Sequence, residues 1–175
     1  MANVDNPHGL RPLMRTIDGG EISLEEFDKD VNEAAAIFIF DLVNRETDGN
    51  IEANGATPAT TLFNGVSLNY GAAATATKHQ VIVNPGAIYE AQDNADTEGF
   101  VTADQGLNAN IELNAGSATT LISGHEVDES TWDVTASLDL KLLKLHPIPG
   151  NAYGPNARIQ VMINKHRMNP VAVGV

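Results

Sequence analysis

Ser123, His125 and Asp128 bring the three residue types of a serine hydrolase into one short stretch of the chain. In such enzymes a histidine removes the proton of the serine hydroxyl, and a carboxylate orients that histidine. A serine on a nucleophile elbow lies in the motif G-x-S-x-G, whereas Leu121 and Ile122 precede Ser123. No other serine of the sequence stands in this motif. The pattern therefore does not predict a hydrolase, and we expect no catalytic residue.

The same region holds the densest group of potential metal ligands in the chain. Its members are His125, Glu126, Asp128, Glu129 and Asp133. The group lacks the glycine-placed alternation of a calcium loop, and the five histidines of the sequence show no HExxH or HxH spacing. The absence of cysteine excludes thiolate metal sites and disulfides. We expect a solvated acidic loop at residues 125–133, with no metal site.

Two other kinds of enzyme are disfavoured for different reasons. Any two of the 23 acidic residues could converge into the carboxylate pair of a glycosidase, so the sequence leaves that arrangement open. One Trp, three Tyr and five Phe are few for a cleft that stacks on sugars. Neither a P-loop nor a GxGxxG motif is present. We expect a non-enzymatic protein that needs no cofactor.

The formal charge of −13 excludes the common partners of basic proteins. Binding to duplex nucleic acid depends on cations that contact phosphates, and anionic membranes likewise attract basic segments. The charge is unevenly distributed, because residues 46–140 hold fourteen acids and one base, Lys78. Residues 141–175 hold no acid and five bases. This last segment could contact something negative, including another copy of the chain, or its charges could lie on solvated strands.

The length of 175 residues suits one domain and leaves room for an extended arm. The longest apolar stretch, residues 34–40, is about a third of the roughly 20 residues that a membrane span needs. The N-terminus lacks a basic region followed by an apolar run, so we expect no signal peptide and synthesis in a cytoplasm.

Short apolar or alternating segments separated by turn residues fill most of the chain, which is typical of all-β proteins. We expect a compact sandwich or barrel, with a jelly-roll-like arrangement as one option, and at most one short helix near residues 30–36. The Asp48-Gly49 pair predicts a hairpin between residues 40–45 and 51–53. Asn84-Pro85-Gly86 predicts a second hairpin between residues 79–83 and 87–92.

The clearest strands come late in the chain. Leucines at 138, 140 and 142 alternate with charged residues until the pattern slips by one position at Leu143, which predicts a β-bulge. In residues 158–164, Ile159, Val161 and Ile163 lie on one predicted face. Gln160 and Met162 lie on the opposite face. We expect the aliphatic face of this strand to be buried.

Residues 1–20 show no periodicity and are rich in Asn, Pro and Gly. Pro7 and Pro12 fix φ and remove backbone donors, which favours an extended path. Leu10, Leu13 and Met14 are apolar groups that a free tail does not require. We therefore expect residues 1–20 to form an extended N-terminal arm that docks on a partner, followed by a single β-rich domain over residues 21–175.

Several blocks of the sequence resemble a group of tailed-phage virion proteins. The blocks are NPHGLRPL (6–13), IYEAQD (88–93), LNANIEL (107–113), SGHEVDEST (123–131) and LKLLKLHPIPGNAYGPNARIQVMINKH (140–166). The last block is the most specific, because a strand, a Pro-Asn-rich loop and a final strand ending in Asn-x-His recur in that group. The blocks cover about half of the chain. Residues 21–36 depart from the pattern, since they are more acidic and more helix-like.

The resemblance implies a cement or decoration protein on the outer surface of a bacteriophage head. Its partners would be the major capsid protein and copies of itself, as trimers or dimers, with neither nucleic acid nor membrane. The expected partner-binding residues are Pro7, Leu10, Arg11, Pro12, Leu13, Met14 and Arg15. The alternative is a host-surface or carbohydrate-binding module displayed on the virion. Such a module needs an exposed aromatic platform, for which Trp132 is the visible candidate.

Overall fold

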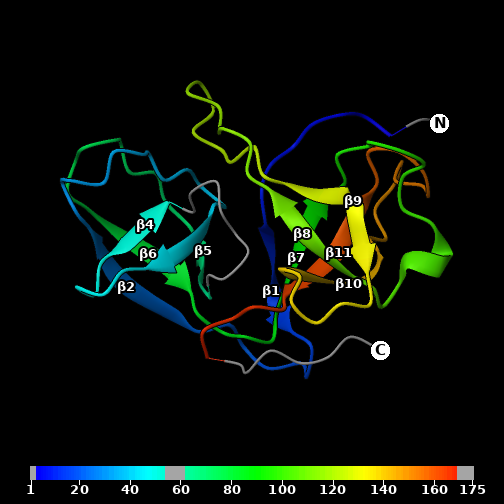
Figure 1. The fold of residues 1–175 in the computed structure, drawn as a ribbon, viewed down its shortest axis with the longest axis horizontal. Coiled ribbons are helices and arrows are strands. Elements are labelled where there is room, and N and C mark those ends of the chain that lie inside the picture. Colours follow the sequence, from blue (N-terminus) through cyan, green and yellow to red (C-terminus); the bar gives the residue numbers. More distant parts are fainter. Residues whose placement is uncertain (1–2, 54–61, 169–175) are drawn as a thin grey trace.

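The computed structural model describes residues 3–53 and 62–168, and over these ranges the fold is all-β, as expected. Eleven strands form two sheets, which lie side by side as two lobes in Figure 1. One sheet is a closed five-stranded barrel, and the other has six strands. The helical content of the described residues is one 3₁₀ turn, η2 (Thr102–Asp104).

The barrel has the strand order β2-β4-β3-β5-β6. Its strands are β2 (Leu24–Lys29), β3 (Leu42–Arg45), β4 (Ile51–Ala53), β5 (Phe63–Ser67) and β6 (Thr77–Ile82). The predicted hairpin around Asp48-Gly49 is confirmed, because β3 and β4 pair antiparallel through Asn44 and Glu52. Inside the barrel, Val43, Ile51 and Val81 are fully buried and pack together.

The six-stranded sheet has the order β1-β7-β11-β10-β8-β9, and its neighbours are all antiparallel. Its strands are β1 (Arg11–Thr16), β7 (Ala87–Gln92), β8 (Asn108–Glu112), β9 (Glu126–Asp133), β10 (Leu140–Leu145) and β11 (Arg158–Ile163). A bridge between Asp93 and Val127 brings β9 back toward the end of β7. The sheet therefore curls around its own apolar face.

The two predicted late strands are confirmed with their register. The pairing of β10 with β11 shifts between Leu142 and Lys144, so the extra residue of the bulge is Leu143. Ile159, Val161 and Ile163 are at most 1% exposed and belong to the main core. The slip in the leucine pattern was thus a correct signal of a bulge.

The two sheets share one hydrophobic core and are tied by backbone hydrogen bonds. Leu42, Phe63 and Ile82 of the barrel pack in the same buried cluster as Tyr89 and Val161 of the six-stranded sheet. The Phe63 N–H donates to the Lys165 carbonyl, and the Arg167 N–H donates to the Phe63 carbonyl, both at 2.8 Å. The lobes therefore form one packed body.

The N-terminal residues run along the six-stranded sheet. Arg11–Thr16 form β1, which pairs with β7 through Arg11 opposite Glu90 and Pro12 opposite Tyr89. Leu10 is fully buried in the main core, and its N–H donates to the Phe40 carbonyl. The segment expected as an arm thus supplies an edge strand and a core residue to this chain.

Residues 30–36, where at most one short helix was expected, form turns. Two other expectations about local structure were wrong. The second hairpin does not form, because β6 pairs with β2 and β5 while β7 pairs with β1 and β11. The predicted acidic loop at 125–133 is the strand β9, in which Val127 and Glu129 are buried.

Candidate functional site

The outer face of β1, β7, β11 and β10 concentrates the positive charge of the described residues. These four strands contain five cations, Arg11, Arg15, Lys141, Lys144 and Arg158, and one acid, Glu90. The remaining strands of the same sheet, β8 and β9, contain five acids and no cation. We call the outer surface of β1, β7, β11 and β10 the cationic face. It stands out because the whole chain carries a charge of −13.

Side-chain alternation explains which groups point outward. Successive residues of a strand face opposite sides, so Tyr89, Ile159 and Val161 enter the core while Glu90 and Gln160 face away from it. Glu90 and Gln160 are paired residues on neighbouring strands, and both are at most 3% exposed. They are covered by longer side chains from the adjoining strands and from the N-terminal residues.

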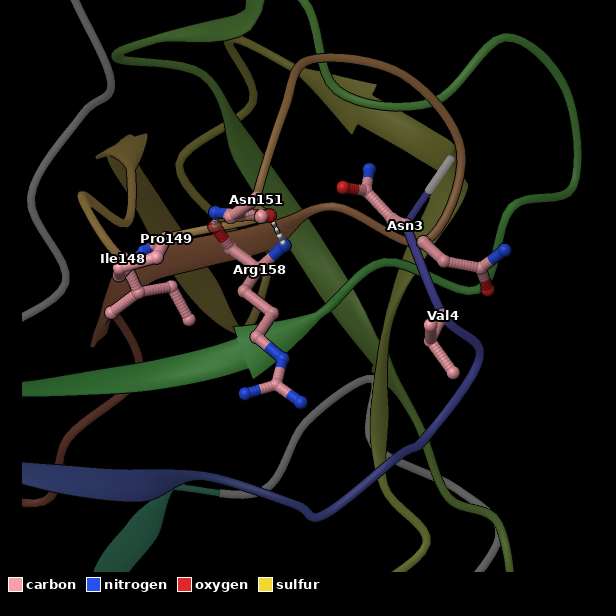
Figure 2. Close-up of a pocket in the computed structure, with 8 residues that line it drawn as sticks. Asn3, Val4, Ile148, Pro149, Asn151 and Arg158 are labelled. Atoms are coloured by element: carbon pink, nitrogen blue, oxygen red, sulfur yellow. Dashed lines mark hydrogen bonds between the residues drawn. The ribbon is translucent and has the colours of Figure 1, made fainter. Parts of the chain in front are cut away.

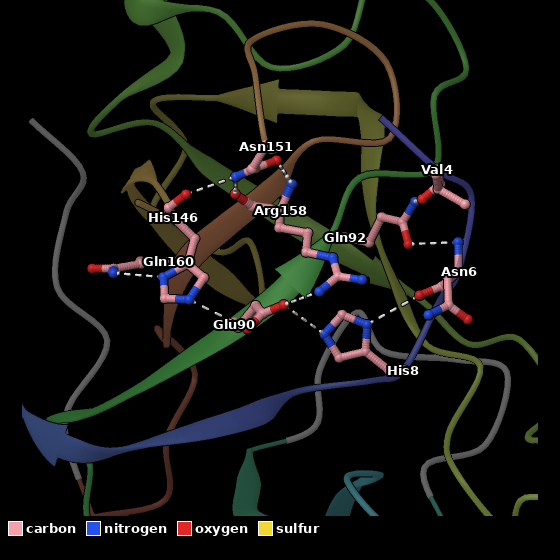
Figure 3. Close-up of polar contacts among 9 residues, drawn as sticks. All are labelled: Val4, Asn6, His8, Glu90, Gln92, His146, Asn151, Arg158 and Gln160. Atoms are coloured by element: carbon pink, nitrogen blue, oxygen red, sulfur yellow. Dashed lines mark hydrogen bonds and ion pairs between the residues drawn. The ribbon is translucent and has the colours of Figure 1, made fainter. Parts of the chain in front are cut away.

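Glu90 is the centre of a buried polar cluster (Figure 3). Its Oε1 lies 3.3 Å from His8 Nε2 and 3.2 Å from Arg158 Nη1. Its Oε2 lies 3.4 Å from His146 Nε2. Burial acts to raise the pKa of the Glu90 carboxyl, but the hydrogen bond from His8 and the charges of His8, His146 and Arg158 outweigh it, so the pKa lies below its usual range.

The two histidines of this cluster differ in their hydrogen bonding. The Nδ1 atom of His146 accepts from Gln160 Nε2 at 2.9 Å, so the neutral ring carries its proton on Nε2, facing Glu90. Burial lowers the pKa of His146, and Arg15 and Arg158 lower it further against the opposing charge of Glu90. His8 faces acceptors with both nitrogens, since Nδ1 lies 3.1 Å from the Asn6 carbonyl oxygen. It donates to both only when doubly protonated.

The cluster holds a surface arginine in place. Arg15 donates from Nη2 to Gln160 Oε1 at 2.9 Å, and the amide of Gln160 donates in turn to His146. A chain of polar contacts therefore runs from Glu90 through His146 to Gln160 (Figure 3). It continues from Gln160 to the exposed guanidinium of Arg15.

A pocket of about 260 Å³ lies where the N-terminal residues cross the loop between β10 and β11 (Figure 2). Asn3 donates from Nδ2 to the carbonyl oxygens of Ala152 and Pro155, both at 2.9 Å. Val4 and Arg158 line the pocket, and Val4 is 75% exposed. Gln92 also binds this segment, accepting from the Asn6 N–H at 3.0 Å. The N-terminal residues are thus attached to the border of the cationic face.

The expected partner-binding residues divide into three groups. Arg11, Met14 and Arg15 are exposed, and Met14 is 64% exposed. Pro7, Pro12 and Leu13 are partly buried, and Leu10 is fully buried in the core of its own chain. The sequence reasoning missed Glu90, His146, Lys144, Arg158 and Gln160 as parts of the same surface. The one signal that could have found them is the absence of acids after residue 140.

The serine, histidine and aspartate that suggested a hydrolase do not assemble into a triad. Ser123 and His125 are buried, and His125 Nε2 lies 3.5 Å from Asp41 Oδ1. The Ser123 hydroxyl donates a hydrogen bond to the Asp41 carboxyl, so Asp41 contacts both Ser123 and His125. In a hydrolase triad the histidine lies between the acid and the serine. Asp128 accepts hydrogen bonds from Ser130.

The acids of β8 and β9 are hydrogen-bonded within the chain. Glu129 accepts from the N–H groups of Thr97, Glu98 and Gly99, at 2.6 to 2.9 Å. Glu112 accepts from Asn94. In the same way, Glu126 accepts from Asn114, Asp128 from Ser130 and Asp133 from Thr135.

The aromatic residues give a small exposed surface. Trp132 is partly buried and packs edge-on against Phe100, with ring centroids 5.7 Å apart. Tyr153 stacks on the same ring at 6.0 Å and is 46% exposed. The candidate platform for carbohydrate is therefore reduced to Tyr153, with Trp132 serving largely as packing.

Comparison of this chain with protein-family models, curated proteins and solved structures finds no match. In the part of the chain that the structure describes, no helix has the length and apolar character to cross a membrane.

Proposed function

We propose that this chain is a non-enzymatic structural protein of a phage virion that binds the outer capsid shell and cements neighbouring shell subunits. The observation that carries the proposal is the cationic face, with five cations around one neutralised acid on a chain of charge −13. Such a surface suits an acidic protein partner, since complementary charge favours encounter and register.

The resemblance and the geometry point to the same surface. Residues 6–13 lead into β1, residues 88–93 cover most of β7, and residues 140–166 span β10 and β11. Three of the five resembling blocks therefore belong to the elements of the cationic face and its border. Beside its cations the face exposes Met14 and Ile17, a mixture of Arg and apolar groups that is typical of protein interfaces.

The proposed partners are the major capsid protein, which would contact the cationic face, and copies of the chain itself, as trimers or dimers on the shell. The acids of β2, β8 and β9 suit the outside of a head, since packaged DNA would repel them. The alternative of a carbohydrate-binding module is less supported, because only Tyr153 offers an exposed ring beside Phe100.

A reconstitution experiment tests the proposal. Heads that lack this protein are saturated with the wild-type chain, with Lys144→Glu or with Lys78→Glu, and DNA release is followed on heating. Lys144 belongs to the cationic face, whereas Lys78 lies on the barrel and makes the same change of charge elsewhere. A protein that binds the intact shell but not its separated subunits stabilises the shell. The wild type and Lys78→Glu should therefore delay DNA release, and Lys144→Glu should delay it less. Release at the same temperature with and without wild-type protein would refute the cement function.

A further inference from the structure

A groove of about 520 Å³ crosses the cationic face between the end of β1 and the bulge of β10. Six of the residues that line it carry the argument: Arg15, Ile17, Ile88, Leu143, Lys144 and Gln160. Its size falls within the usual range for ligand sites, roughly 300–1,000 Å³. None of its lining residues is acidic.

The groove combines an apolar lining with cations. Ile88 on β7 and Leu143 on β10 supply aliphatic surface on the two sides of β11. Ile17, which follows β1, also lines the groove and is 59% exposed. Arg15 and Lys144 are exposed and make no ion pair with any residue of the described ranges. Unpaired cations beside apolar surface suit a ligand that has both carboxylates and an apolar side chain.

Arg15 is oriented before any ligand arrives. Its bond to Gln160 fixes the guanidinium, and Gln160 is itself held by His146. One donor is used in this way, and a guanidinium has five, so others are available for a carboxylate. A side chain that is already ordered loses less conformational entropy on binding, which favours affinity.

We propose that this groove binds an extended peptide segment that contains both acidic and apolar residues, contributed by the shell protein. Carboxylates of the segment bind Arg15 and Lys144, and an apolar side chain packs on Ile88 and Leu143. The identity of the partner rests on the proposed function, whereas the chemistry of the segment rests on the groove.

A second copy of this chain fits the groove less well. Its acids on β8 and β9 are already hydrogen-bonded within their own chain. The acids of β2 stand on a strand that is paired with both β4 and β6, so β2 cannot be presented as a free extended segment. These contacts favour a segment from another protein.

Fluorescence anisotropy with defined peptides tests the proposal on the full chain. The probe is a labelled peptide of five Asp-Leu pairs, compared with peptides of Lys-Leu and of Asp-Ser pairs. We expect saturable binding of the Asp-Leu peptide, weakened by salt, and weaker binding of the other two. Arg15→Gln with Lys144→Gln should reduce affinity about tenfold or more, because it removes both cations that bind the carboxylates. Leu143→Ser should reduce it as well.

Lys78→Gln serves as the matched control, and thermal melts verify that each variant is folded. Equal binding by the wild type and the double variant, equal binding of the Asp-Ser peptide, or no saturation up to roughly 1 mM would overturn the proposal. Self-association of the wild type that the double variant loses in sedimentation would replace the partner by a second copy and overturn it too.

The two proposals fail separately. Shell binding that is unaffected by the double variant would leave the cement function standing and remove the groove as its site. If the protein binds the peptide through Arg15 and Lys144 but does not bind the shell, the groove proposal would hold and the capsid function would be refuted.

Discussion

Arg15 on β1 donates a hydrogen bond to Gln160 on β11, although β7 lies between these two strands in the sheet. The side chain therefore crosses the outer surface of β7 and links three strands. Gln160 is 1% exposed and also donates to His146, so one buried amide joins the surface arginine to the cluster around Glu90.

Gln160→Ala should lower the free energy of unfolding by about 1–3 kcal/mol, because it leaves a buried nitrogen of His146 without a partner. Urea unfolding of the wild type and the variant measures the loss. Met162→Ala on the same face of β11 is the control for lost side-chain volume at a partly buried position. An unchanged midpoint for Gln160→Ala would mean that the bridge across β7 contributes nothing to stability.

Lys165→Met should lower the free energy of unfolding more, by about 3–5 kcal/mol. Lys165 Nζ lies 2.8 Å from Asp139 Oδ1, and both side chains are buried, so the change leaves a buried carboxylate without its cation. The double variant Asp139→Asn with Lys165→Met removes both charges and should recover part of the loss. A double variant no more stable than Lys165→Met would contradict this account.

Val161→Asp should prevent folding, whereas Met162→Asp should give soluble protein with a lower melting temperature. Val161 is fully buried among the aliphatic groups of β11, and an ionised carboxylate without partners is costly there. Met162 lies on the opposite face and is partly exposed. Soluble yield and circular dichroism distinguish the variants, and comparable folding of both would show that the register of β11 is wrong.

Acid should destabilise the wild type more than His166→Gln. Burial lowers the pKa of His166 from 6.5 to about 4, so the folded chain keeps this ring neutral while the unfolded chain protonates it below pH 6.5. Between pH 6.5 and 4 the histidine should therefore cost up to about 1.4 kcal/mol of stability per pH unit.

The unfolding free energy of the wild type should fall more steeply than that of the variant as the pH falls through this window. His79 remains in both as a second group whose pKa burial lowers to about 4, so the variant keeps part of the acid sensitivity. Stability curves that run parallel over the window would contradict the assignment to His166.

The sequence predicted the β class, the first hairpin, the bulge at Leu143 and the buried face of β11, because each depends on residues close together in the chain. It failed where pairing depends on distant residues. Asn84-Pro85-Gly86 is a turn, but the strands on its two sides enter different sheets, which local turn chemistry cannot specify. Residues 126–133 were not predicted as a strand because they are acidic. In the structure Glu129 of this strand is stabilised by hydrogen bonds from the backbone of residues 97–99.

The candidate site was mostly beyond sequence reasoning for the same reason. Glu90 meets His8 and Arg158 across 82 and 68 positions of the chain, and no local pattern predicts such contacts. Arg11, Met14 and Arg15 were selected as parts of the expected N-terminal arm, and their exposure on β1 agrees with a binding role. Leu10 was selected on the same ground, but its burial in the core assigns it to folding.

The construction of β1 also bears on aggregation. An edge strand exposes unpaired backbone groups that can recruit strands of other molecules, and the barrel avoids this by closure. On β1, Pro12 has no N–H, Met14 has a φ of 55° within an irregular register, and arginines stand at positions 11 and 15. These features disfavour the in-register addition of a neighbouring chain. We therefore expect that this edge does not seed fibrils when the protein is concentrated.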